Sequence, residues 1–324
     1  MEKLRIFVDF SMSAEVLELL RSGMKGHQLM LPQNPSASVL TQSDHDPQFA
    51  TADVAFGQPA TRAIAEAPRL KWVHVSSSGI TRYDTPEFRA LATQRKIILS
   101  NSATVYAEPC AAHALSFILA QARQLPVGLK TRAVGGTPAW HAVRGACRTL
   151  RGESVLIVGY GAIGKRLVEL LQPFDMKIIA YHRRARGDEA VPVLRESELP
   201  GALSEADHVM NILPQSKATD HFFNAARFAS MKRGAIFYNI GRGSTVDQTA
   251  LLQALRSGGI AAAWLDVTEP EPLPDDHPLW AEPNCFITPH VAGGHADEAK
   301  TLVRHFLNNL ERFVRGEPLL DRVL

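Results

Sequence analysis

Apolar positions along the chain follow two spacings, and their alternation predicts a β/α protein. Short apolar runs are separated by segments whose apolar side chains recur three or four positions apart, as in amphipathic helices. Strands are predicted at Leu4–Val8, His27–Leu31, Val54–Phe56, Lys71–Val75, Val155–Val158, Lys177–Tyr181, His208–Ile212, Ala235–Ile240, Ala261–Val267 and Cys285–Thr288. Because strands that alternate with helices pair in parallel, the pattern predicts doubly wound parallel sheets.

The helical pattern is clearest at three places. Ser13 is the predicted N-cap of the first helix, since its hydroxyl can accept a hydrogen bond from a free backbone N–H. A long apolar helix is expected over Ala111–Arg123, and an amphipathic one over Thr301–Val314 that ends at Gly316. Between the two series of strands, Val134–Leu150 contains glycine and proline and predicts a connection between units.

Composition narrows the class of protein. A length of 324 residues suggests about two domains, and 45% hydrophobic with 21% charged residues is ordinary for a globular protein with a sizeable core. These figures exclude collagen, coiled coil and intrinsic disorder. A formal charge of +2 gives no sign of a nucleic-acid or membrane partner. No apolar run approaches the roughly 18 residues of a membrane span.

The cysteines and the N-terminus indicate a cellular compartment. Cys110, Cys147 and Cys285 are odd in number and far apart, without the spacing of a zinc site. Neither a disulfide framework nor a metal site is therefore expected. The first residues turn acidic at Asp9 and lack the cleavage site of a signal peptide. A reducing, cytoplasmic location is the expectation.

A glycine motif follows the predicted strand Val155–Val158. Gly159, Gly161 and Gly164 have the G-x-G-x-x-G spacing and precede an amphipathic helix, which is the context of a dinucleotide-binding turn. The first glycine permits the tight turn, the second lets the backbone approach a pyrophosphate, and the third allows close packing of helix on strand. The N-terminus of the helix then offers N–H groups to the phosphates.

The end of the next strand predicts which dinucleotide is preferred. NAD-binding turns place an acidic residue there for the ribose 2′-hydroxyl. This chain has His182, Arg183 and Arg184 instead, and no carboxylate before Asp188. Two guanidiniums can pair with a 2′-phosphate through charge-assisted hydrogen bonds. NADP(H) is therefore the expected cofactor, with NAD(H) as the alternative.

Three further motifs carry a resemblance to a known family. They are YNIGRGSTVD at Tyr238–Asp247, LDVTEPEPLP at Leu265–Pro274 and ITPH at Ile287–His290. Together with the glycine motif, they resemble the D-isomer-specific 2-hydroxyacid dehydrogenase family, which carries N-x-x-R-G-x-x-V-D, L-D-V-x-x-x-E-P-L and T-P-H segments in this order. The match extends over most of the chain.

The resemblance implies roles for single residues. Arg242 corresponds to the arginine that binds the substrate carboxylate, His290 to the general acid/base, and Glu271 to the carboxylate paired with it. Glu271 is preferred to Glu269 because the family glutamate directly precedes Pro-Leu. The expected substrate contacts are Ser77, Ser78, Gly79, Arg242 and His290. The expected cofactor contacts are Gly159, Gly161, Ala162, Ile163, Gly164, His182, Arg183, Arg184, Leu213, Pro214, Ile240, Gly241, Arg242, His290 and Asp266, which matches a family aspartate near the nicotinamide.

The residue types suit the implied reaction. Reduction of a 2-keto acid delivers a hydride to carbon and a proton to the developing alkoxide. An imidazolium is a suitable proton source near neutral pH, and an adjacent carboxylate favours its charged form. A guanidinium can hold the substrate carboxylate and stabilise charge on the carbonyl oxygen. The hydride chemistry belongs to the cofactor.

The resemblance also implies an architecture. Residues 1–102 and 293–324 are expected to form a flavodoxin-like substrate domain, and residues 103–292 an inserted NAD(P)-binding Rossmann domain, with an active-site cleft between two doubly wound parallel sheets. A homodimer through residues 134–150 is expected. Two departures from the family pattern are Ala112, where a glutamate is usual, and His295, where a small hydroxyl residue is common.

Two functions from different classes remain open. The first is an NADPH-preferring reductase of a small 2-keto acid such as glyoxylate or hydroxypyruvate. Aromatic residues that include Tyr83, Tyr106, Trp140 and Trp280 would favour a larger 2-keto acid if they line the pocket. The second is a dinucleotide-gated, corepressor-like binding protein of the same fold. The absence of a long tail before the last residue, Leu324, favours the enzyme.

Overall fold

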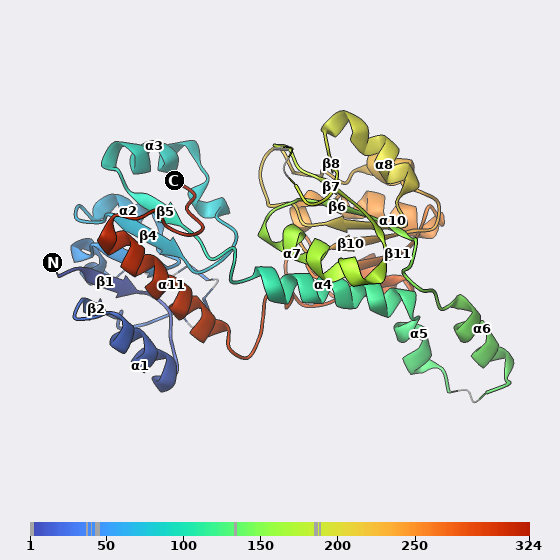
Figure 1. Cartoon of the computed structure of the whole chain (residues 1–324), viewed down its shortest axis with the longest axis horizontal. Helices are drawn as coiled ribbons and strands as arrows, with labels where there is room; N and C mark the ends of the chain where they lie inside the picture. The colour runs from blue at the N-terminus through green and yellow to red at the C-terminus, as the bar shows by residue number, and fades with distance from the viewer. Residues whose placement is uncertain are drawn as a thin grey trace. The chain divides into compact units, whose positions relative to one another are not determined.

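The chain folds into two compact units, described here from a computed structural model. The structure describes residues 3–36, 38–39, 41–42, 46–132, 135–184, 187 and 189–324, so Val134 and Asp188 lie outside the described residues. One unit comprises Met1–Tyr106 with His295–Leu324, and the other comprises Ala107–Gly294 (Figure 1). The predicted boundaries after residues 102 and 292 lie four and two residues before the boundaries of these compact units. The assignment of one unit to the substrate and the other to the cofactor stays a prediction.

The first unit is built on a five-stranded parallel sheet with the order β2-β1-β3-β4-β5. This is the flavodoxin-like order, which confirms the expected fold class for this unit. Its elements are β1 Arg5–Val8, α1 Ala14–Gly23, β2 Gln28–Met30, the 3₁₀ turn η1 Pro47–Thr51, β3 Val54–Gly57, α2 Thr61–Glu66, β4 Trp72–Val75, η2 Thr81–Tyr83, α3 Pro86–Arg95, β5 Ile98–Ser100 and α11 Glu298–Arg315. The strand β5 is not among the strands that the hydrophobic pattern predicts.

The C-terminal helix α11 belongs to the first unit because its apolar face packs on that sheet. Phe306 stacks on Phe56 of β3 with ring centroids 4.4 Å apart, and on Trp72 of β4 at 5.3 Å. α1 lies beside α11 on the same face (Figure 1). The predicted ends are confirmed: the Ser13 hydroxyl caps α1, and Gly316 ends α11 in the left-handed conformation with φ +70°.

The second unit is built on a seven-stranded parallel sheet with the order β12-β11-β10-β9-β6-β7-β8. Its elements are α4 Ala107–Ala122, α5 Leu125–Lys130, α6 Pro138–Ala146, β6 Ser154–Val158, α7 Ala162–Leu171, η3 Gln172–Phe174, β7 Lys177–Tyr181, β8 Val193–Leu194, η4 Glu196–Glu198, α8 Leu199–Glu205, β9 His208–Asn211, α9 Ala225–Ser230, β10 Ala235–Asn239, η5 Gly243–Thr245, α10 Gln248–Arg256, β11 Ile260–Leu265, η6 Pro278–Ala281 and β12 Cys285–Ile287. The strand order reverses between β6 and β9, as in Rossmann folds, so this unit is also of the predicted class.

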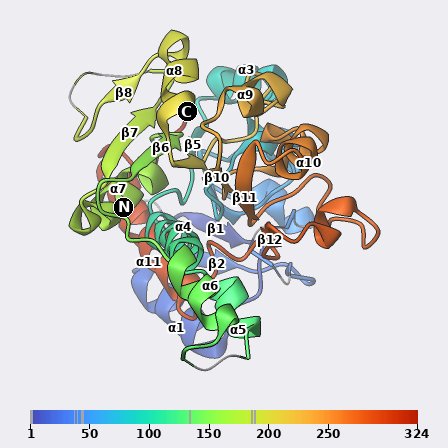
Figure 2. The ribbon, with the colours of Figure 1, turned by 90° about the vertical axis from the view of Figure 1, so that its right-hand side faces the viewer.

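The segment 134–150 is not a connection between units, as the sequence pattern suggested. Its described part lies inside the second unit and contains α6, which Thr137 caps by accepting a hydrogen bond from Trp140 N. The prediction was wrong because Pro138 is the first residue of the helix, a position that tolerates proline, and because α6 also accommodates Gly145. α5 and α6 stand off the seven-stranded sheet beyond the end of α4 (Figures 1 and 2).

No helix in the described part of the chain is long and apolar enough to cross a membrane.

Candidate active site

The glycine motif forms a closely packed turn at the carboxyl end of β6. Gly159 has φ +113°, and a Cβ there would lie 2.8 Å from Ile212 O at the end of β9. A Cβ on Gly164 would lie 2.4 Å from Gly159 O, so helix and strand can approach only because both residues are glycine. Gly161 is the N-cap of α7, and a Cβ there would meet nothing within 4 Å. The turn therefore leaves the N-terminus of α7 open to a phosphate.

The other predicted cofactor residues of this edge follow neighbouring strands. Ala162 and Ile163 form the first turn of α7. Leu213 and Pro214 come after β9, and a Cβ on Gly241, after β10, would lie 2.6 Å from Leu213 O. These residues gather at the carboxyl ends of strands beside the switch point, where open α/β sheets bind their ligands. The cradle thus fits a dinucleotide.

The end of β7 presents two exposed guanidinium groups. Arg183 and Arg184 are exposed, and the backbone N–H of Arg184 donates to His182 Nδ1 at 3.2 Å. Neither side chain forms an ion pair with a described residue, and Asp188 is not among those residues. Within the described part of the chain, no ion pair therefore neutralises their charge.

His290 and Glu271 form a hydrogen-bonded pair at the carboxyl edge of the same sheet. His290 Nδ1 lies 2.9 Å from Glu271 Oε2, and Thr268 N donates to Glu271 Oε1 at 3.0 Å. The side chains are 40% and 37% exposed, so both can meet a ligand. Because Nδ1 faces the carboxylate, Nε2 is the nitrogen free for proton transfer.

The pair favours the charged imidazole. The hydrogen bond and charge of Glu271 raise the pKa of His290 above its usual value, although partial burial and Arg242 oppose this. Burial works to raise the pKa of Glu271, but the hydrogen bond from His290, Thr268 N and Arg242 together lower it. The pair therefore stabilises a protonated histidine beside an ionised glutamate.

Arg242 is held between two glycines that permit a close approach of neighbouring loops. A Cβ on Gly243 would lie 1.8 Å from Thr268 O, so the loop after β10 touches the loop that leads to Glu271. The Arg242 guanidinium donates from Nη1 to Gly241 O at 2.6 Å. Burial lowers its pKa, while the charge of Glu271 raises it, and an arginine stays charged throughout.

Asp266 has a buried side chain, and its contact with the cofactor stays a prediction. Its carboxylate is buried and accepts hydrogen bonds from its own unit, at Thr288 Oγ1, Val291 N and Ala292 N. His113 of α4 approaches the same carboxylate, with 3.6 Å between Nε2 and Oδ1. The contacts of Thr288 and His113 with Asp266 could not be predicted, because no local sequence pattern joins these residues.

The Ser77–Gly79 loop lies in the first unit, at the carboxyl end of β4. Ser77 Oγ donates to Gly79 O at 2.7 Å and accepts from Gln58 Nε2 at 2.9 Å. Gln58 Oε1 in turn accepts from Arg82 Nη1 at 3.0 Å. Gln58 and Arg82 therefore support the loop, and no motif in the sequence announces either of them.

Several other predicted positions have different surroundings. Tyr83 is 1% exposed and donates to Pro59 O, so it belongs to the core of the first unit rather than to a pocket wall. Tyr106 is also buried, with its hydroxyl near Ser76 O at 3.1 Å. Ala112 lies exposed on α4, and His295 is exposed ahead of α11.

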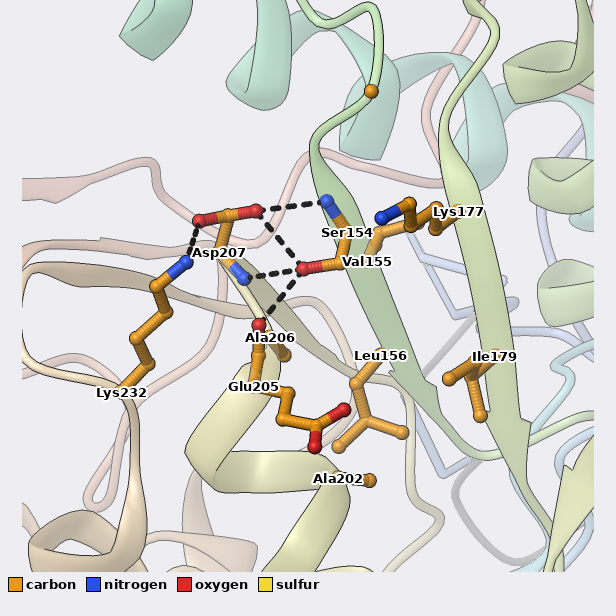
Figure 3. Close-up of a pocket in the computed structure, with 11 residues that line it drawn as sticks. Ser154, Val155, Leu156, Lys177, Ile179, Ala202, Glu205, Ala206, Asp207 and Lys232 are labelled. Atoms are coloured by element: carbon orange, nitrogen blue, oxygen red, sulfur yellow. Dashed lines mark hydrogen bonds and ion pairs between the residues drawn. The ribbon is translucent and has the colours of Figure 1, made fainter.

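A cavity at the opposite edge of the seven-stranded sheet lies apart from these groups. It has a volume of about 290 Å³ and opens at the amino end of β6, around Ser154, Lys177, Asp207 and Lys232 (Figure 3). Asp207 accepts from Ser154 N at 2.9 Å and pairs with Lys232 Nζ at 2.6 Å. Ser154, Asp207 and Lys232 thus satisfy one another's hydrogen-bonding groups at the amino edge of the sheet. The glycine turn and the His290–Glu271 pair lie at the opposite, carboxyl edge.

Comparison with known proteins places this geometry in a family. Residues 115–292, more than half of the chain, match the D-isomer specific 2-hydroxyacid dehydrogenase NAD binding domain. A glyoxylate/hydroxypyruvate reductase B from Citrobacter koseri is 34% identical over 298 residues, which cover 88% of each chain.

Solved structures resemble the whole chain. A D-isomer specific 2-hydroxyacid dehydrogenase from Xanthobacter autotrophicus Py2, in complex with NADPH and MES, has a TM-score of 0.79 at 26% identity, covering 100% of this chain and 98% of that one. An NADPH-dependent glyoxylate/hydroxypyruvate reductase from Sinorhizobium meliloti, with NADP and malonate, has a TM-score of 0.76 at 26% identity, covering 99% and 97%. The chain therefore belongs to the D-isomer-specific 2-hydroxyacid dehydrogenase family, and it is an NAD(P)-dependent oxidoreductase.

Proposed function

We propose that this protein reduces a small 2-keto acid of the glyoxylate or hydroxypyruvate type to the D-2-hydroxy acid, with NADPH as preferred cofactor. The observation that carries the proposal is the pairing of His290 with Glu271 on the same sheet edge as an open glycine turn. The names of the Citrobacter and Sinorhizobium relatives support the substrate class, and the NADP in the Sinorhizobium structure supports the cofactor.

His290 is the proposed proton donor. Bound NADPH supplies a hydride to the carbonyl carbon of the keto acid. As charge develops on the carbonyl oxygen, His290 transfers the proton from Nε2, and Glu271 stabilises the imidazolium through Nδ1 until that moment. The reaction consumes one keto acid, one NADPH and one proton, and yields one hydroxy acid and NADP⁺.

Arg242 and the Ser77–Gly79 loop are the proposed carboxylate-binding groups. The partly buried guanidinium of Arg242 keeps its charge and can hold the substrate carboxylate while it stabilises the developing negative oxygen. Arg242→Ala should weaken substrate binding and turnover together, because the same group acts on the ground state and the transition state. Steady-state kinetics that separate KM from kcat check this.

The cofactor preference is assigned to Arg183 and Arg184, whose exposed side chains have no ion-pair partner among the described residues. Replacing both by alanine should cost on the order of 1.5–3 kcal/mol of NADPH binding, roughly 10- to 150-fold in affinity, and leave NADH binding nearly unchanged. Lys177→Ala, an exposed cation at the other end of β7, is the matched control and should change neither affinity. Equal use of both cofactors by the parent protein would contradict the preference.

A panel of 2-keto acids tests the substrate class. NADPH oxidation is followed with glyoxylate, hydroxypyruvate and pyruvate, and with a bulky keto acid such as phenylpyruvate. The highest kcat/KM is expected for glyoxylate or hydroxypyruvate. A preference for phenylpyruvate would replace the proposal by a reductase of larger substrates, and no activity with any keto acid would remove it.

A homodimer and a cytoplasmic location are part of the proposal. Along α5, Leu125, Val127 and Leu129 are 47%, 49% and 85% exposed, an apolar surface suited to a second copy. Light scattering at micromolar concentration should give the mass of a dimer, and Leu129→Glu should reduce it. Leu31→Glu, at an exposed leucine of the other unit, is the control, and a monomeric parent protein would contradict the dimer.

Three free thiols agree with the reducing compartment that a cytoplasmic location provides.

A further inference from the structure

The carboxylate of Glu196 lies near the end of the strand beside the one that presents the arginine pair. β8 pairs in parallel with β7, and the last pair in this register is Tyr181 with Leu194. Arg183 and Glu196 each follow two residues beyond that pair, so both charges leave the sheet at its carboxyl edge. The Tyr181 hydroxyl donates to Glu196 Oε2 at 2.8 Å. The end of β7, which has no carboxylate of its own, thus gains one from the neighbouring strand.

A carboxylate at this edge opposes binding of a 2′-phosphate. In turns that select NAD, an acidic residue at the end of the corresponding strand binds the ribose 2′-hydroxyl. A phosphate on that hydroxyl would be repelled by the same charge. An unpaired Glu196 would therefore work against the preference for NADPH that Arg183 and Arg184 are proposed to give.

Arg227, in the first turn of α9, pairs with this carboxylate. Its Nη2 donates to Glu196 Oε1 at 2.7 Å, while Nη1 donates to Phe222 O. Its Cζ lies 3.7 Å from the centroid of the Phe222 ring, which is a cation–π contact. The Arg227 side chain is 25% exposed, whereas that of Glu196 is 62% exposed. The guanidinium is therefore held by Phe222 at a fixed place, where it neutralises the more exposed carboxylate.

The hydroxyl of Tyr181 lies within reach of all these charges. Burial, together with the hydrogen bond and the charge of Glu196, raises the pKa of Tyr181 to about 12, while Arg227 and Arg183 oppose this rise. Arg183, Arg227 and Glu196 thus act on one common group. They form a single cluster of charges at the end of β7.

We propose that Arg227 determines cofactor specificity through Glu196: it neutralises the carboxylate that β8 brings to the end of β7, so that a 2′-phosphate meets a net positive charge there. The proposal rests on the proposed preference for NADPH, in which Arg183 and Arg184 bind that phosphate. Arg227 itself needs no contact with the cofactor. Its loss would leave an unpaired carboxylate at this edge, as in turns that select NAD.

A double-mutant cycle on the full-length protein tests the proposal. Dissociation constants for NADPH and NADH are measured by fluorescence titration at low ionic strength. Arg227→Ala should weaken NADPH binding about three- to tenfold, the effect of one exposed charge near a phosphate, and should not weaken NADH binding. Adding Glu196→Gln to Arg227→Ala should restore NADPH binding, because no charge is then left to neutralise. Arg227→Lys keeps the charge and should bind NADPH nearly as the parent does.

Salt separates the charge of Arg227 from its packing on Phe222. The ratio of the NADPH dissociation constants of Arg227→Ala and the parent should approach one at about 0.5 M salt, because ions screen exposed charges. A ratio that does not change with salt would assign the loss to the missing contacts with Phe222 and would overturn the proposal.

Glu198→Gln is the matched control. Glu198 belongs to the same 3₁₀ turn η4 as Glu196, but its Oε2 accepts from Arg195 N at 2.8 Å. An amide oxygen can accept the same hydrogen bond, so neither cofactor affinity should change. A change as large as that in Arg227→Ala would mean that any charge of the turn has this effect, and the assignment to Glu196 would be wrong.

Two further outcomes would overturn the proposal. One is an equal loss of NADPH affinity in Arg227→Ala with and without Glu196→Gln, which would show a structural role for Arg227. The other is an equal loss for NADPH and NADH, which would show that the 2′-phosphate is not involved.

Failure of the proposed function is a separate result. Equal affinity of the parent for NADPH and NADH would refute the preference, and no reduction of any keto acid would refute the activity. The cycle still decides the role of Arg227 in both cases, because it compares NADPH affinities among variants and needs no turnover.

Discussion

Two histidines, one in each unit, have polar neighbours but opposite chemistry. His74 lies in β4 of the first unit and is fully buried, with Nδ1 at 2.7 Å from Ser100 Oγ and Nε2 at 3.3 Å from Ser102 Oγ. His290 of the second unit is 40% exposed and faces the Glu271 carboxylate at 2.9 Å. The pKa of His74 falls to about 3, whereas that of His290 rises.

The difference teaches what turns a histidine into an acid/base group. Burial is the main cause for His74, reinforced by the neighbouring His305 and opposed by Asp321. Hydroxyl groups satisfy a neutral ring but do not stabilise a charge. His290 instead has a carboxylate partner and access to water, and both stabilise the imidazolium relative to a buried ring. The partner and the exposure decide the role, because the side chain is the same.

The largest expected effect is on turnover at His290. His290→Ala should reduce keto-acid reduction by about 10²–10⁴-fold, the usual contribution of a positioned acid/base, while NADPH binding survives. His141→Ala, on α6, is a control that should leave the rate unchanged. Steady-state assays measure the rate, and an unchanged rate in His290→Ala would remove the mechanism proposed here.

Replacement of His74 should instead lower the stability of the protein and leave its turnover unchanged. His74→Leu leaves the hydroxyls of Ser100 and Ser102 without the ring nitrogens and should cost about 1–3 kcal/mol of the free energy of unfolding. The activity per folded molecule should persist. Urea unfolding followed by circular dichroism measures the loss. A His74→Leu protein that is stable but inactive would contradict the purely structural role assigned to His74.

The pH dependence of stability should have opposite signs at the two residues. In the unfolded chain each histidine titrates near 6.5. Native His74 stays neutral down to about pH 3, whereas the unfolded chain binds a proton at this residue below pH 6.5. The free energy of unfolding therefore decreases as the pH falls from 6.5 toward 3. The raised pKa of His290 instead contributes stability below 6.5, which is lost as pH rises through the folded value.

Unfolding at a series of pH values checks both signs. His74→Leu should flatten the decline of stability on the acid side, because the variant lacks the ring that takes up a proton on unfolding. His290→Gln should flatten the change above pH 6.5. The same slope in parent and His74→Leu would contradict the assignment of a buried, neutral His74.

The smallest expected effect is the pH shift in Glu271→Gln. The amide keeps the shape of the side chain but removes the charge that raises the pKa of His290. Reduction, which needs the protonated ring, should decline at a lower pH than in the parent, and oxidation of the hydroxy acid should extend to lower pH. A pH–rate profile in both directions tests this, and coincident profiles would dismiss Glu271 as the partner.

Local patterns were enough for much of the fold. Strand and helix periodicity predicted two parallel β/α series, Ser13 capped α1, and Gly316 ended α11. The glycines of the β6 turn were placed by spacing alone, because positive φ and close backbone approach admit no other residue at Gly159. The helix α6 was not predicted, since Pro138 at its start and Gly145 within it are residues typical of loops.

The amino-acid sequence by itself determined the glycine turn, the two arginines after β7 and the order of the motifs that carry Arg242, Glu271 and His290, because each depends on residues close along the chain. Only the tertiary structure decided which side chains meet. Asp266 contacts His113 of α4, far away in sequence, because α4 brings this ring beside both Asp266 and Thr288. The tertiary structure likewise brings His74 against two hydroxyl groups and His290 against a carboxylate. Strand order and helix packing bring such partners together, and no local spacing records them.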